Sequence, residues 1–212
     1  MMNTDDFLHY ENIGFPQVGQ KIFISDFTFG ETAQVAWSKD SETQFFGYIS
    51  GYKEAANDVI RSALEKGNVG TLDSYVFPAI FLYRQFLELA LKDIYLAYSD
   101  DAEEDKVKKI DKCRHNLKEI WKNVKPLIDD DPHILPAVED YIFEFADFDS
   151  GSYAYRYPLD MKLNLYHEKP KLINLRNLAE RINELAWYLE CVGTGLEVRR
   201  NDIHEMRYCG II

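Results

Sequence analysis

The sequence predicts an all-α protein, a bundle of four to five main helices with a long irregular excursion and an N-terminal arm. Apolar residues recur at intervals of three and four through most of residues 41–192, which is the spacing of one helix face. Hydrophobic residues make up 46% and charged residues 28% of the chain, as in ordinary globular domains. A length of 212 residues suits one large domain better than two. We therefore expect an arm at residues 1–40 and one helical bundle domain at residues 41–212.

The first helix is expected from Ser41, after an arm in which "QKIFISDFTFG" (20–30) could form an extended segment or a hairpin arm. The letters "SETQ" resemble a capping box, with Gln44 three residues after the cap. An apolar stripe at helical spacing then continues up to Gly67, a residue that commonly ends helices.

The second helix is expected over residues 74–98, with Pro78 near its first turn, where a missing N–H is tolerated. Its apolar residues cover almost the whole circumference, which is typical of a central helix. We therefore expect residues 76–96 to form the most buried helix. The acidic stretch at 99–105 is interpreted as a solvated connection.

Two shorter helices are expected next. Asn116 and Glu119 indicate a helix start, and that helix should stop before Pro126. The letters "DDDP" (129–132) predict a cap for a helix at roughly 133–147, because acidic residues complement the helix dipole.

The last long helix is expected to begin near Asn174, with a buried stripe that ends at Val192. Gly193 and Gly195 are expected to break it, so that the chain ends in a short helix or continues after a kink.

Between these helices, residues 148–171 are rich in Gly, Pro and Tyr and predict an irregular excursion. The letters "SYAYRYP" alternate, so Tyr153, Tyr155 and Tyr157 are expected to face one way and Arg156 the other.

Charge and cysteine usage narrow the class of function. A formal net charge of −12 argues against a protein that coats nucleic acid and leaves room only for a local basic cleft. The three cysteines and five histidines show no metal-ligand spacing, so we expect no metal and no cofactor. Sparse cysteines and the absence of a signal peptide or of a long apolar run predict a cytoplasmic protein that does not enter a membrane.

The segment "FLYRQFLELALKDIY" (81–95) places Arg84, Glu88 and Lys92 on one face of an apolar helix. They could form an ordinary ladder of surface ion pairs, or line a polar pocket in which the two cations attract a phosphate. His115 lies just before a helix start, where it could assist anion binding or sit in an exposed loop. Arg84, His115 and Arg156 are expected to share one cavity if a site of this kind exists.

Two further sets of residues could carry chemistry. Tyr155 and Arg156 would suit stacking on a base or nucleotide, or the tyrosines could simply cover the core. Arg199 precedes His204 by five positions, and metal-free RNA cleavage needs an acid or base near the ribose 2′-OH and a cation at the phosphate.

Several motifs together resemble a group of bacterial proteins with HEPN-type helical domains. The resemblance spans about residues 45–190. It is carried by "YISGYKEAANDVI", "FPAIFLYRQFLELALK", "RHNLKEIW", "FDSGSYAYRYPLD" and "INLRNLAERINEL".

This resemblance implies a bundle of four or five helices, a homodimer, and metal-independent endoribonuclease activity in toxin–antitoxin, antiphage-defence or RNA-processing systems. Catalytic members carry an Arg followed after about four to six residues by His, which Arg199 and His204 match, with Arg200 in the polar position. The implied partners are RNA or a nucleotide, and an antitoxin or defence-system protein. Other members are non-catalytic, so the alternative is a helical module that binds a nucleotide or a partner without cleaving it.

Overall fold

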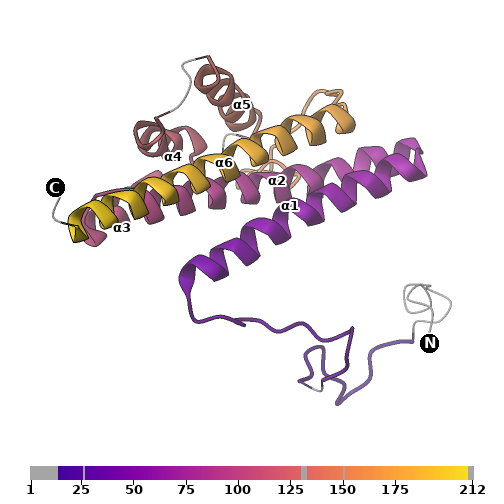
Figure 1. Ribbon diagram of the computed structural model, residues 1–212. Helices are drawn as coiled ribbons and strands as arrows, with labels where there is room; N and C mark the ends of the chain where they lie inside the picture. The colour runs from indigo at the N-terminus through magenta and orange to yellow at the C-terminus, as the bar shows by residue number, and fades with distance from the viewer. Residues whose placement is uncertain (1–13, 26, 130–132, 150, 210–212) are drawn as a thin grey trace. The chain divides into compact units, whose positions relative to one another are not determined.

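The computed structural model describes residues 14–25, 27–129, 133–149 and 151–209 (Figure 1). The chain divides into two compact units, Met1–Trp37 and Ser38–Ile212. In the first unit the described residues form turns and irregular backbone. Those of 20–30 form no strand, so of the two alternatives, an extended segment or a hairpin arm, the hairpin is not found. Several large apolar side chains of this unit, such as Phe15 and Phe29, are exposed.

The second unit is an all-α bundle, which confirms the predicted fold class. The described residues contain six α-helices, one 3₁₀ turn and no strand longer than an isolated bridge. These elements are α1 (Ser41–Lys66), α2 (Val69–Tyr98), α3 (Glu103–Cys113), α4 (Leu117–Val124), η3 (Lys125–Leu127), α5 (Leu135–Phe148) and α6 (Leu175–Tyr208).

Helix α2 lies at the centre of this unit. It runs beside α1 as a helical hairpin and also contacts α3, α4 and α6 (Figure 1). All eleven buried residues of α2 lie within 76–96, more than any other helix buries, which confirms the expected central helix. Because its neighbours cover several sides, two of its charged residues, Arg84 and Glu88, are buried.

The predicted helix caps are partly confirmed. Asn116 and Asn174 cap α4 and α6 as expected, each accepting backbone N–H groups of the first turn. Gly67 ends α1 in the left-handed conformation. Helix α1 begins at Ser41 as expected, but its cap is Asp40 rather than Ser41, because the side chain of Asp40 accepts the N–H of Thr43 at 2.8 Å.

Two boundaries near α2 differ from the prediction. The helix begins at Val69, capped by Asn68, so Pro78 lies inside it rather than in its first turn. The expected solvated connection at 99–105 is short, because α3 begins at Glu103. Its Lys106 is buried and donates to the backbone oxygen of Leu96 at 2.8 Å, which ties α3 to the last turn of α2.

The start of α5 and the course of α6 also became clear only from the structure. Helix α5 starts at Leu135 and has no side-chain cap; residues 130–132 of the expected "DDDP" cap lie outside the described residues. Helix α6 continues through Gly193 and Gly195, so the predicted break is wrong. The six buried residues of α6 all lie between 175 and 192, and the rest of this helix is a largely exposed extension.

The tyrosine segment of the excursion is a turn and not an extended strand. The backbone N–H groups of Arg156 and Tyr157 both bond to the oxygen of Tyr153 at 3.0 Å. The side chains therefore do not alternate as predicted: Tyr155 is 6% exposed, whereas Tyr153 and Tyr157 are 47% and 55% exposed.

Candidate functional site

The row on α2 is a buried charged network instead of a surface ladder. Glu88 is 4% exposed and accepts the ammonium of Lys92 at 2.7 Å. One Glu88 oxygen lies 3.8 Å from Nη1 of Arg84, one helical turn away. These intervals of four residues place all three groups on the face of α2 that meets the turn between α3 and α4.

Arg84 is the most confined cation of this network. It is 1% exposed, and its Nη2 donates to the backbone oxygen of His115. Its Nε and Nη1 have no hydrogen-bond acceptor among the described residues. Burial lowers the pKa of the guanidinium, which the nearby carboxylates of Glu88 and Asp149 partly oppose and the charge of Arg156 reinforces. Arg84 thus holds the α3–α4 turn against α2 while its own donors are incompletely satisfied.

His115 connects this network to solvent. Its Nδ1 lies 3.0 and 3.2 Å from the two oxygens of Glu88, and its side chain is 52% exposed. A buried carboxylate that orients an imidazole resembles the support of an acid–base histidine. Here the same carboxylate also neutralises Lys92 and Arg84, so the contacts are equally those of a structural clamp.

Arg156 lies in the same region, within electrostatic reach of Arg84. Its guanidinium is 4.9–5.8 Å from the ring centres of Phe81, Tyr153 and Tyr157, and its Nε donates to the oxygen of Ser152. Arg84, His115 and Arg156 therefore lie in one region of the bundle, and each is engaged by groups of the chain itself. That they share one cavity stays a prediction.

The ring of Tyr155 belongs to the core. It stacks on Phe148 with centres 5.4 Å apart and packs against His167 at 4.8 Å. Burial raises the pKa of its hydroxyl. A ring packed on these neighbours favours the packing interpretation of Tyr155 over base stacking.

Arg199 and His204 line a second place, a depression of about 460 Å³ at the end of α6. Five helical positions place two side chains about 140° apart around a helix axis. Both reach this depression because it is wide and also includes residues 97–100 at the end of α2 and Pro126–Leu127 after α4. We call it the basic depression.

Two further arginines line the basic depression, Arg200 and Arg207. Arg200 donates to the backbone oxygen of Ala97 at 3.5 Å, and its guanidinium lies 5.2 Å from the ring centre of Tyr98. Arg200, His204 and Arg207 follow the i, i+4, i+7 spacing of one helix face. This spacing could have revealed Arg207 from the sequence, had the helix not been expected to break at the glycines.

The structure does not bring the two sets of candidate residues into one site. Arg84 and Tyr98 lie on the same helix, 98 − 84 = 14 residues apart. At the rise of an α-helix this corresponds to about 21 Å. The Arg84 network and the basic depression are separate places.

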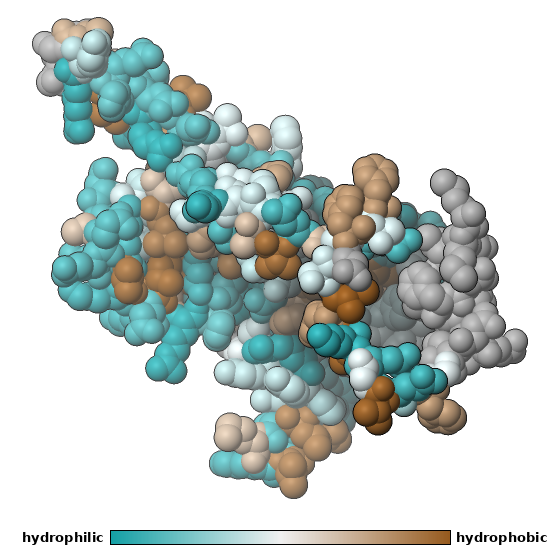
Figure 2. All heavy atoms as spheres, turned by 90° about the horizontal axis from the view of Figure 1, so that it is seen from below, coloured by the Kyte–Doolittle hydropathy of each residue, from teal (hydrophilic) through white to brown (hydrophobic). Residues whose placement is uncertain are grey.

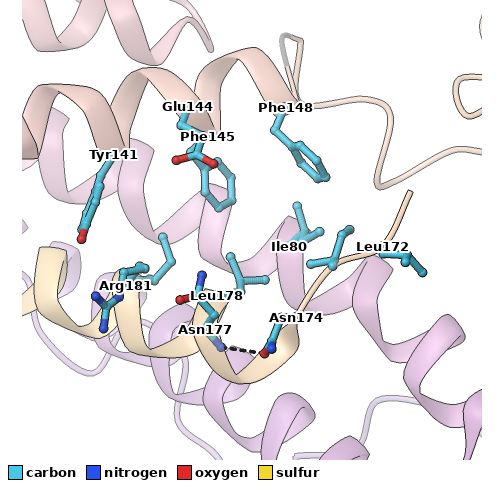
Figure 3. Close-up of a pocket in the computed structure, with 12 residues that line it drawn as sticks. Ile80, Tyr141, Glu144, Phe145, Phe148, Leu172, Asn174, Asn177, Leu178 and Arg181 are labelled. Atoms are coloured by element: carbon cyan, nitrogen blue, oxygen red, sulfur yellow. Dashed lines mark hydrogen bonds between the residues drawn. The ribbon is translucent and has the colours of Figure 1, made fainter. Parts of the chain in front are cut away.

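A third recess lies between α5 and the start of α6 (Figure 3) and has a volume of about 270 Å³. Its walls are mostly apolar. Tyr141 and Arg181 close one end, and both bind Glu184, at 3.5 and 2.8 Å. Both side chains are thus engaged by Glu184, although Nε of Arg181 is buried without an acceptor among the described residues.

Comparisons with known proteins identify no relative: no family model, no curated protein and no solved structure matches the chain. Within the part of the chain that the structure describes, no three His, Cys, Asp or Glu side chains are grouped as metal ligands would be. In the same part, no helix has the length and apolar character needed to cross a membrane.

Proposed function

We propose that the protein is a metal-independent endoribonuclease of HEPN type that acts at the basic depression. One observation carries the proposal: Arg199 and His204 line the same concave surface, together with Arg200 and Arg207. In a chain with a net charge of −12, three arginines against one carboxylate, Asp100, give this depression a local positive excess that suits an RNA phosphate.

The chemistry follows from the residue types. His204 removes the proton of a ribose 2′-OH, and the resulting oxygen attacks the adjacent phosphorus. The bond from phosphorus to the 5′-oxygen breaks, and that oxygen takes a proton from a histidine. Arg199 stabilises the charge that develops on the phosphate. The products are a 2′,3′-cyclic phosphate and a 5′-hydroxyl, and a homodimer would supply a second histidine for the second proton transfer.

One observation favours the non-catalytic alternative. None of the described residues forms a hydrogen bond with His204, and its side chain is exposed. A catalytic imidazole is usually oriented by a partner. The second candidate is therefore a cytoplasmic module that uses the same arginines to bind RNA or a nucleotide, and acts with an antitoxin or defence-system protein.

The test is an assay of purified protein with single-stranded and structured RNA, with and without chelator. We expect cleavage that chelator does not slow and that leaves 2′,3′-cyclic phosphates. His204→Ala and Arg199→Ala should each lower the rate by about 10²–10⁴. Arg176→Ala, an exposed cation at the other end of α6, is the matched control and should keep full activity.

The salt dependence of binding separates the two candidates from an unrelated function. Three phosphate contacts predict that the logarithm of the binding constant falls with the logarithm of the salt concentration with a slope of about −2 for single-stranded RNA. Binding with this slope that Arg200→Ala and Arg207→Ala weaken, without cleavage, would support the non-catalytic candidate. Absence of both binding and cleavage would refute the proposal.

A further inference from the structure

A groove between α1, α2 and α6 contains a carboxylate that the fold does not use. Its volume is about 210 Å³. Most of its lining is apolar, including Phe46 from α1, Phe86 from α2 and Leu189 from α6. Asp93 of α2 is the acidic group in this lining that lacks a partner, and we call the recess the Asp93 groove. Figure 2 shows how apolar side chains are exposed between hydrophilic ones on one face of the molecule.

Asp93 forms no hydrogen bond or ion pair with any described residue, although it is only partly exposed. Burial, and to a smaller extent the charge of Glu42, raise the pKa of Asp93 from 3.8 to about 6. A carboxylate that loses water without gaining a donor is destabilised. A cation that entered the groove would remove this penalty.

The other charges around the groove do not neutralise Asp93. Lys53 from α1 also lines the groove, but its ammonium is paired with Glu190 and Glu54 at 3.3 and 3.5 Å. Tyr98 at one end of the groove lies under the guanidinium of Arg200, at 5.2 Å. The remaining nearby charges, Glu42 and Glu197, are negative. The groove therefore presents net negative charge above an apolar floor.

The groove also has free space on its α6 side. Gly193 belongs to its lining, and a Cβ atom added there would meet no other atom within 4 Å. The bare backbone at this position leaves room for a thin, unbranched group beside Leu189.

We propose that the Asp93 groove binds a primary ammonium group carried on an unbranched apolar stem. The ammonium pairs with Asp93, and the aromatic side chains of Phe46 and Phe86, which line the groove, contact the cation and its stem. The stem replaces water along Leu189. This inference does not rest on the proposed function, because it involves neither Arg199 nor His204.

The direct test is calorimetric titration with n-hexylamine, with n-hexanol and hexanoate as matched probes of the same stem. We expect saturable binding of the amine, at least tenfold weaker binding of the alcohol and none of the acid. Nα-acetyl-lysine N-methylamide carries the same ammonium on a lysine side chain. Comparing its binding with that of n-hexylamine shows whether the groove takes a lysine side chain or only a free amine. Equal binding of hexylamine and hexanol, or no binding of either amine, would overturn the proposal.

Variants locate the binding. Asp93→Asn should abolish the preference for the amine, whereas Asp73→Asn, an exposed carboxylate on the same helix, should keep it. Gly193→Leu should fill the groove and weaken binding at least tenfold without loss of helix content. If Asp93→Asn does not fold, carboxyl NMR of the wild-type protein decides: the amine must lower the pKa of Asp93, and an unchanged titration refutes the site.

Discussion

Glu88→Gln tests whether the buried charged network stabilises the bundle. The substitution keeps the size of the side chain and removes its charge. In the folded protein, Glu88 faces three cationic partners: Lys92 at 2.7 Å, His115 at 3.0 Å and Arg84 at 3.8 Å. Lys92 and His115 can turn toward water, since their side chains are 15% and 52% exposed, but that of Arg84 is 1% exposed and cannot.

The expected cost follows from this asymmetry. Removing one member of a buried ion pair costs about 3–5 kcal/mol, because the other charge stays buried without compensation. For a domain of this size the loss corresponds to a fall in Tm of about 6–20 °C. Arg84→Met should cost less than Glu88→Gln, because it leaves Glu88 paired with Lys92 and His115 and removes two unsatisfied donors. The double variant should then show a coupling of about 1–3 kcal/mol.

The assay is urea unfolding followed by circular dichroism, with calorimetry for Tm. Glu65→Gln, an exposed residue of α1, is the control and should change stability by less than about 0.5 kcal/mol. A cost of Glu88→Gln below about 1 kcal/mol would refute the reasoning, and so would strictly additive single variants. Either result would mean that water or a rearrangement of the chain supplies hydrogen-bond acceptors and charge compensation to the guanidinium of Arg84.

Three further predictions concern the bundle itself. Leu91→Ala should lower the free energy of unfolding by about 2–5 kcal/mol, since Leu91 is 0% exposed. Leu89→Ala should cost clearly less, because Leu89 is only partly buried, and equal losses of stability in chemical denaturation would contradict this difference in burial. Because the pKa of Asp93 is raised to about 6 by burial, the folded state takes up a proton more readily, so this group's contribution to stability is lost as pH rises from about 4 to 6. Asp93→Asn should therefore stabilise the protein by about 1–2 kcal/mol at pH 7 and by almost nothing at pH 4, after allowance for solvent screening; a gain that does not depend on pH would count against this. Gly67→Ala should destabilise by about 1 kcal/mol, because φ is +61° there; an unchanged Tm would show that the cap relaxes.

Local patterns alone predicted much of the fold. The apolar stripes along α1, α2 and α6 revealed the all-α class, since a 3.6-residue period is visible in the sequence without knowledge of any partner. The caps at Asn116 and Asn174 were also predictable, because each side chain bonds to backbone groups two or three residues away.

Features that depend on distant residues were not predictable in this way. The buried stripe of α6 ends at Val192, so periodicity indicated a break at the following glycines. The helix continues, and its extension contacts the end of α2 through Arg200 and Ala97. Two glycines cost only about 1 kcal/mol each in a helix, which such contacts and the helix formers that follow can offset.

The roles of the charged residues were decided by tertiary structure. The sequence by itself placed Arg84, Glu88 and Lys92 on one helix face, because four-residue spacing is a local property. It could not show whether that face meets water or protein. Packing of the α3–α4 turn against α2 buries Arg84 and Glu88, and packing of α6 across the end of α2 gathers Arg199, Arg200 and His204 in one depression. Burial and convergence depend on contacts between segments far apart in the chain, and no local spacing encodes them.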